Sequence, residues 1–511
     1  MGEFHSPVKA KRSRSTKIVD HHAITIRHLP NELLLHIFFF HRLLSGTNNR
    51  PPSVAWKWHT LAHVCQRWRE LIFTSLRHLE AHLVIPRKSP ETPLDSWPAL
   101  PLSVWCDSSY FNLSEEEKAD IVAAFKYSDR IREIHLPMAI GYSFWTSIRN
   151  KSFPELEHLA LSGIPGYPVP LSHEFLGGAT SSPRRLRSIF LSYIHLPSLP
   201  QLLFSSRDLV SLHLGYYTLT HHGFISISPE DLSTALSATT KLEYLYIHCV
   251  PGFVASPPEL RSANSSPFIL TVLPALTYFH FGGFIKYMED FLSRIHAPHL
   301  VTLNIHSHED VMGVPQLSQF ISRTEQLNSV PFQTSISFGM EHFSIDHHFR
   351  RLPSPRELSR VYFKNVYMGD LQVSRVDHIC RQLSLLASSV KQLKLSAFRL
   401  PSNLQRKTDP APWLQLLAPY NSVEEIEICG KGGPCTGFAW ALRQSTRETA
   451  QELLPALRVL RIRGFHSRSI RLTLMSFAAA RRRAGRPVIM GRLERTDQDA
   501  KWEINDDTCE L

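Results

Sequence analysis

The sequence predicts an α/β protein, in which a small N-terminal helical module precedes a long, irregular solenoid of parallel strands joined by helical returns. Two amphipathic helical patterns lie close together in residues 23–85. A leucine-based triplet then recurs down the chain from residue 131 to residue 462. The 511 residues are too many for one ordinary core, which agrees with a repeat array behind a separate module.

The N-terminal module begins with AITIRHLPNELLLHIFFF at residues 23–40. Pro30 stands at a helix start, and the apolar positions that follow have helical spacing. After a polar, proline-containing loop, a second apolar pattern predicts another helix with one apolar face; it consists of Leu61, Val64, Cys65, Trp68, Leu71 and Ile72. Because these few short helices bury little apolar area by themselves, part of their apolar surface is expected to be covered by a partner.

LPNELLLHIF, followed after an insert by WHTLAHVCQRWRELI, resembles the F-box, and VCQRWRE resembles the form found in large fungal F-box families. The resemblance covers residues 24–75. It implies docking onto the Skp adaptor and, through Skp, onto a cullin-RING ubiquitin ligase. The implied contact residues are Leu29, Pro30, Leu33, Leu34, Ile37, Phe38, Leu61, Val64, Cys65 and Trp68. For Leu33, Ile37, Val64 and Trp68, packing within the module is the alternative. The insert from Leu44 to Trp58 is longer than the family pattern.

The repeating triplets have the form L-x-x-L-x-L and mostly recur about every 23 to 34 residues. This spacing predicts a degenerate leucine-rich repeat, whose x-L-x-L core is a short parallel strand with alternate side chains pointing inward. The triplets are Ile131/Ile134/Leu136, Leu156/Leu159/Leu161, Leu186/Ile189/Leu191, Leu209/Leu212/Leu214, Leu242/Leu245/Ile247, Leu276/Phe279/Phe281, Leu300/Leu303/Ile305, Leu358/Val361/Phe363, Val390/Leu393/Leu395, Val423/Ile426/Ile428 and Leu457/Leu460/Ile462. Gln333/Ile336/Phe338 stands where the one long gap lacks a triplet.

Several segments between the triplets carry helix patterns. Ser114 precedes EEEKADIVAAF as an N-cap, and LSQFISRTEQL and HICRQLSLLA are similar in character. A helix and strand in residues 469–490 are expected to form a terminal unit. The predicted divisions are a disordered basic tail at 1–22, the F-box at 23–85, the solenoid at 86–494 and an acidic tail at 495–511.

Composition restricts the function classes. The net charge of +11 permits an acidic partner, and the basic block Lys9–Lys17 permits nuclear import or a nucleic-acid patch, although a solvated tail is the preferred interpretation. Seven scattered cysteines predict no disulfide framework and an intracellular, cytoplasmic or nuclear, location. No secretory or membrane segment is predicted.

The paired histidines lack further ligand motifs, so neither a metal nor another cofactor is expected, and no catalytic motif is present.

These observations together predict a non-enzymatic substrate-recognition adaptor of an SCF-type ligase. The F-box would bind Skp, and the concave solenoid surface would bind an unknown protein substrate. The predicted substrate-contact residues are His213, Tyr216, Tyr246, His248, His280 and His306. The alternative is a leucine-rich scaffold or nucleic-acid-associated binder outside any ligase, which predicts steeply salt-dependent binding to nucleic acid.

Overall fold

The computed structural model divides the chain into two compact units, Met1–Val84 and Ile85–Leu511. The structure describes residues 26–45, 58–75, 83–85, 100–106, 114–137, 145, 151–163, 169–170, 185–195, 198–218, 227–250, 270–307, 313–328, 331–338, 342–349, 359–366, 379–381, 387–397, 410–429, 435–445, 453–463 and 468–493. The predicted tails at 1–22 and 495–511, and most of the insert after Leu44, lie outside these residues.

The first unit is helical, as its apolar periodicity predicts. A 3-10 turn η1 (Ile26–His28) leads through Pro30 into α1 (Asn31–Ser45), and two short helices follow, α3 (Trp58–Ala62) and α4 (Gln66–Thr74). The prediction of one helix over residues 61–72 is wrong. Cys65 has an extended backbone (φ −160°, ψ 168°), which ends the helical path and makes Cys65 the N-cap of α4.

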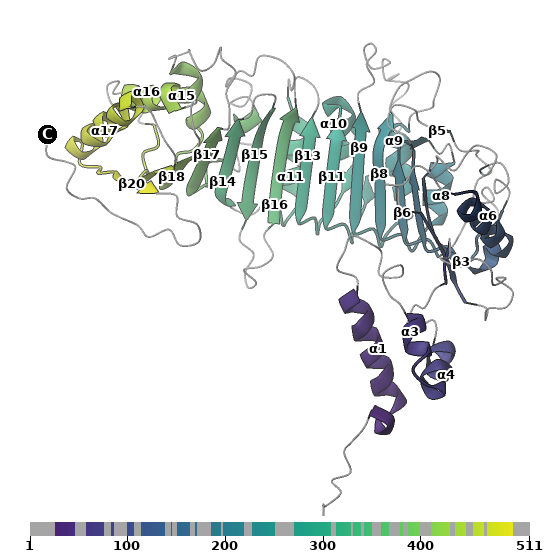
Figure 1. The fold of residues 1–511 in the computed structure, drawn as a ribbon. Helices are drawn as coiled ribbons and strands as arrows, with labels where there is room; N and C mark the ends of the chain where they lie inside the picture. Colours follow the sequence, from purple (N-terminus) through teal and green to yellow (C-terminus); the bar gives the residue numbers. More distant parts are fainter. Residues whose placement is uncertain are drawn as a thin grey trace, which may run out of the picture. The chain divides into compact units, whose positions relative to one another are not determined.

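The second unit is α/β and contains a 16-stranded sheet in the order β1-β2-β3-β4-β6-β8-β9-β11-β13-β16-β15-β14-β17-β18-β19-β20 (Figure 1). Two small pairs, β10-β12 and β5-β7, lie outside it. The strands are β1 (Leu83–Ile85), β2 (Leu102–Trp105), β3 (Ile131–Pro137), β4 (His158–Ser162), β5 (Val169–Pro170), β6 (Ser188–Ser192), β7 (Ile194–His195), β8 (Ser211–Thr218), β9 (Tyr244–Val250), β10 (Thr271–Val272), β11 (Tyr278–Gly283), β12 (Ile295–His296), β13 (Thr302–Ser307), β14 (Pro331–Phe338), β15 (His342–Phe349), β16 (Ser359–Val366), β17 (Gln392–Ala397), β18 (Glu425–Cys429), β19 (Val459–Arg463) and β20 (Ile489–Leu493).

The apolar triplets form continuous buried rows across this sheet. Leu212 pairs in register with Leu245, Leu245 with Phe279, and Phe279 with Leu303, all between parallel strands. Almost all described triplet residues are buried; Ile462 and Gln333 are only half-buried, and Leu358 and the side chain of Phe338 lie outside the described part. The triplets therefore correctly predicted strands and their core face. Whether the units are leucine-rich repeats stays a prediction.

The strands do not all follow one another in sequence order. β16 pairs with β13 in parallel, β15 pairs with β16 and with β14 in antiparallel fashion, and β14 pairs with β17 in parallel. The triplet at Gln333 does lie on a strand, β14, but β16 and β15 separate this strand from β13. The expectation of an uninterrupted parallel series is wrong here, because a period-2 pattern specifies a face of a sheet and carries no information about strand direction.

The helices of the second unit lie along one face of the sheet (Figure 1). They are α6 (Glu115–Ala124), η3 (Phe125–Arg130), α8 (Leu199–Ser205), α9 (Pro229–Leu236), α10 (Ile285–Arg294), α11 (Pro315–Arg323), α15 (Ala411–Leu417), α16 (Cys435–Ser445) and α17 (Arg468–Arg483). The predicted helices at 114–125, in LSQFISRTEQL and at the terminal unit are confirmed, and Ser114 and Glu117 form a capping box. In HICRQLSLLA, residues 379–381 are helical, and 382–386 lie outside the described part.

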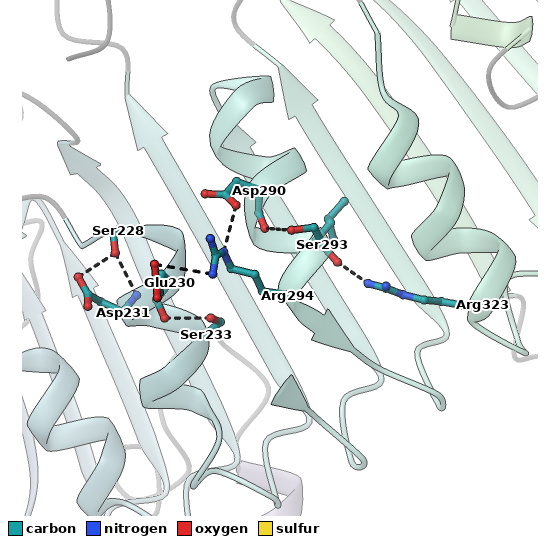
Figure 2. Close-up of polar contacts among 9 residues, drawn as sticks. Ser228, Glu230, Asp231, Ser233, Asp290, Ser293, Arg294 and Arg323 are labelled. Carbon is teal, nitrogen blue, oxygen red and sulfur yellow. Dashed lines mark hydrogen bonds and ion pairs between the residues drawn. The ribbon is translucent and has the colours of Figure 1, made fainter. Parts of the chain in front are cut away.

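Polar bridges join successive helices, as Figure 2 shows for α9, α10 and α11. Arg294 of α10 lies 3.8 Å from a carboxylate oxygen of Glu230 on α9 and 3.0 Å from one of Asp290. Arg323 of α11 donates to the main-chain carbonyls of Leu292 and Ile295. These bridges fix the spacing of the helices and so support the opposite face of the sheet, which carries polar side chains and, among the described residues, no helix. We call this opposite face the open face.

Candidate docking surfaces

The predicted Skp-contact residues separate into a buried and an accessible group. Leu34 and Phe38 are buried against the rest of the unit, where the ring of Phe38 lies 4.9 Å from that of Trp68 in an edge-to-face arrangement. Ile72 and Leu71 of α4 complete this core. The half-buried residues are Leu29, Leu61 and Trp68, and the exposed ones are Pro30, Leu33, Ile37, Val64 and Cys65. Leu34 and Phe38 therefore stabilise the module itself.

The accessible residues of α1 form one apolar stripe. Leu33, Ile37 and Phe40 are spaced i, i+4 and i+7, which places them on one side of the helix. Their exposed fractions are 50%, 44% and 58%. We call these three residues the α1 stripe. Phe40 was missed by the sequence prediction, although its spacing from Leu33 was visible.

Arg67 is a second residue that the sequence prediction missed. Its guanidinium donates to the side-chain oxygen of Asn31, at 2.8 and 3.1 Å, and to the main-chain carbonyl of Leu29 at 2.6 Å. These bonds tie α4 to the first turn of α1, next to the Leu29-Pro30 turn. No local pattern reveals such a bond, because its partners lie 36 and 38 positions earlier in the chain.

On the open face, planar side chains stack across neighbouring strands. The ring of His213 on β8 lies 4.2 Å from that of Phe190 and 3.9 Å from that of Tyr246, and Tyr246 lies 4.1 Å from His280. The His213-Tyr246 and Tyr246-His280 ring pairs are each tilted by only 4°. His280 then meets His306 edge to face. The structure therefore brings together most of the residues predicted to contact substrate; the side chain of Tyr216 lies outside the described part.

His248 completes this group from the next row of positions. Its ring lies 6.2 Å from that of Tyr246 and 6.1 Å from that of His280, and its Nδ1 lies 3.4 Å from the Tyr246 hydroxyl. A Cβ atom at Gly282 would lie 2.5 Å from His248 Nδ1. Glycine at this position therefore lets the His248 ring lie over strand β11.

Burial keeps two of these imidazoles neutral. Desolvation, reinforced by nearby His248, lowers the pKa of His213 to about 4. Desolvation also lowers the pKa of His280 to about 3, with further contributions from His306, His248 and His213. Both rings are consequently uncharged near pH 7, so the stack offers ring edges and hydrogen-bonding groups without charge.

The open face is different on the strands that follow. Arg360 of β16 makes two hydrogen bonds to the Asp346 carboxylate of β15, at 2.8 and 2.7 Å. Further on, Glu427 of β18 lies between Lys394 and Arg463, at 3.9 and 3.1 Å. These ion pairs cross from strand to strand, and the sequence prediction missed them because the neighbours depend on the sheet order.

Metal sites and membrane-spanning helices are two other classes of functional feature. Within the residues that the structure describes, no group of three or more histidine, cysteine or acidic side chains could hold a metal ion. The same part of the chain contains no helix that is long and apolar enough to cross a membrane.

Comparison with known proteins concerns the first unit. The F-box-like family model matches residues 26–78, which include the α1 stripe, Arg67 and α4. No curated protein matches the chain. The N-terminal resemblance is thus supported as an F-box-like domain, a type of domain associated in general with substrate recognition in SCF ligases; the fungal resemblance stays a prediction.

Proposed function

We propose that this protein is a substrate-recognition adaptor of an SCF-type cullin-RING ubiquitin ligase. The observation that carries the proposal is an F-box-like domain at residues 26–78 whose first helix keeps an apolar stripe accessible. The domain would bind Skp, and the second unit would hold a protein substrate. The chain would perform no chemistry itself, because tethering a substrate near activated ubiquitin raises the effective concentration of the reacting groups.

The α1 stripe supports the Skp side of this proposal. Leu33, Ile37 and Phe40 leave large apolar areas in water, although Leu34 and Phe38 already supply the core. Contiguous exposed apolar residues are typical of interaction sites. Burying one such side chain fully contributes about 1.5–3 kcal/mol, so a partner that covers the stripe would gain substantial affinity.

The open face supports the substrate side. It combines stacked aromatic and histidine side chains with accessible polar groups, and tyrosine-rich surfaces of this kind suit protein recognition. On this proposal the second unit is an irregular leucine-rich-repeat solenoid without cofactor. The protein would act inside the cell, in the cytoplasm or the nucleus.

Affinity purification tests the division of labour. We expect the tagged full-length chain to retain Skp and a cullin, and a chain consisting of residues 85–511 to lose both. Proteins retained by both baits would be candidate substrates of the second unit. Recovery of Skp with the shorter chain would contradict the proposal. Failure to recover Skp with either bait would contradict it as well.

One observation favours a second candidate function, binding to nucleic acid outside a ligase. The exposed side of α17 carries Arg468, Arg471, Arg482 and Arg483, and no acidic residue lies in this helix. Such a cluster would bind phosphates with affinity that falls steeply as salt rises. Absence of nucleic-acid binding at low salt, together with Skp recovery, would exclude this candidate.

A further inference from the structure

Six neighbouring strands of the open face, β4, β6, β8, β9, β11 and β13, display no Asp, Glu, Lys or Arg at the positions that alternate with the buried apolar rows. We call this region the neutral band. Its residues are His158, Ala160, Ser162, Ser188, Phe190, Ser192, Ser211, His213, Gly215, Tyr244, Tyr246, His248, Tyr278, His280, Gly282, Thr302, Asn304 and His306.

The centre of the neutral band is the ring stack. His280 is only 5% exposed, and its Nε2 atom is buried without a hydrogen-bond partner in the described part of the chain. Such an atom gains when a partner supplies a hydrogen bond. Because burial lowers the pKa of both His280 and the nearby His213 and keeps these two rings neutral, a charged group placed beside them would lose its hydration without an opposite charge to pair with.

Among the described side chains, no further ring stacks on one end of the ring stack. Phe190 stacks on His213 on one side, and its register neighbour on the other side is Ala160 of β4, which carries only a methyl group. A planar side chain supplied by a partner could lie over Ala160 and continue the stack, which favours an aromatic residue there.

Charge returns at the other end of the band. On β16, Lys364 is the register neighbour of His306. Arg360 on the same strand is paired with Asp346, whereas Lys364 has no ion pair within the described residues. Lys364 is half-buried, so a carboxylate beside it would form an ion pair that is partly shielded from solvent.

We propose that the neutral band binds an extended segment of a substrate protein. This segment places an aromatic side chain over Ala160, continues with an uncharged run along the band and has an acidic residue beyond that run, at Lys364. Strands lie about 4.8 Å apart, so the path from β4 to β16 is roughly 29 Å, which an extended chain covers with about nine residues. The inference rests on the proposed function, since it specifies the substrate class of the surface assigned to substrate binding.

Selection from a displayed library of random 15-residue peptides on the immobilised full-length chain tests this inference. We expect enriched peptides to contain an uncharged run of about seven residues with an aromatic residue near one end and Asp or Glu beyond the other. Binding of a selected peptide should fall at least tenfold with Lys364→Glu, and replacing its acidic residue by Lys should restore binding to that variant.

Two further variants locate the contact. Ala160→Val should weaken the binding of the selected peptide and should have little effect on the binding of a peptide whose aromatic residue is replaced by alanine. Arg482→Glu makes the same charge change on α17 and should leave binding intact. No enrichment over the bare support, enrichment of charged runs, or insensitivity to Lys364→Glu would each overturn the inference. The selection does not involve Skp, so its failure and a failure of Skp binding are distinguishable.

Discussion

At the scale of single residues, a polar pair lies inside the core where the apolar rows would otherwise continue. His347 of β15 and Thr334 of β14 are 2% and 0% exposed, and their Nδ1 and Oγ1 atoms lie 2.7 Å apart. In the sheet, this pair stands between Val361 and Leu393. The bond satisfies the buried hydroxyl, but it places an ionisable ring in the core.

This buried ring predicts a loss of stability in mild acid. Burial, opposed in part by Asp346, lowers the pKa of His347 to about 4. The unfolded chain, with a pKa of about 6.5, therefore takes up the proton first, and the free energy of unfolding falls by up to about 1.4 kcal/mol per pH unit between about pH 6.5 and 4. We expect calorimetric melting temperatures to fall less steeply with pH in His347→Leu/Thr334→Val than in the wild type.

Exposed His299 provides the control, because His299→Gln should retain the wild-type pH dependence. His213 and His280 also have lowered pKa values and contribute to the loss of stability in acid, so the test compares the pH dependence of the double variant with that of the wild type. Equal pH dependence in the double variant and the wild type would contradict the role assigned to His347.

The sequence predicted that apolar residues of α1 and α4 form the core of the first unit. It did not predict which of these apolar residues are buried. Leu33 and Leu34 are adjacent and equally apolar, yet one is 50% exposed and the other fully buried. The whole apolar face of α1 is wider than the small core needs, so the position of α1 relative to α4 decides which apolar residues are covered. That position depends on contacts such as Arg67-Asn31, which helical spacing does not reveal.

At the scale of elements, strand and helix patterns were predictable where they were regular. The capped helix α6 and the terminal α17-β20 pair follow local sequence rules. The break between α3 and α4 was not predicted, because the helical spacing of apolar residues continues through Cys65, whereas the backbone at Cys65 is extended and interrupts the helix. The placement of β14 was not predicted either, since it depends on non-local pairing with β15 and β17.

The link between α4 and α1 leads to a prediction for Arg67. Arg67→Ala removes its hydrogen bonds to Asn31 and Leu29, at a cost of about 1–2 kcal/mol in the local opening of α1. Hydrogen exchange followed by mass spectrometry should show α1 amides exchanging roughly 5–30-fold faster. In Arg67→Lys the α1 amides should also be poorly protected from exchange, because an ammonium group lacks the forked donors of a guanidinium group.

Asn31→Ala serves as the matched partner variant. If Arg67 acts through Asn31, the combined variant should change exchange by less than the sum of the single changes. Unchanged exchange of α1 in Arg67→Ala would show that the bridge does not hold the helix in place.

At the scale of the whole molecule, the chain combines a small F-box-like domain with a larger α/β unit. The sequence prediction of a boundary near residue 85 rests on helical periodicity giving way to recurring strand triplets. The ring stack was visible only as scattered histidines and tyrosines, since register across parallel strands brings together residues that are 23, 33 and 34 positions apart in the sequence. The charge-free extent of the open face required the sheet order as well.

The most direct test of the central proposal is a calorimetric titration of purified Skp into the full-length chain. Leu33→Gln/Ile37→Gln removes apolar area from the α1 stripe while keeping helix-forming residues, and exposed Glu32→Ala is the control on the same helix. The account predicts that the double variant binds at least tenfold more weakly, with an unchanged melting temperature, because about 1.4 kcal/mol of apolar burial corresponds to that factor. Equal Skp affinity in the wild type and the double variant, or no binding by the wild type, would contradict it.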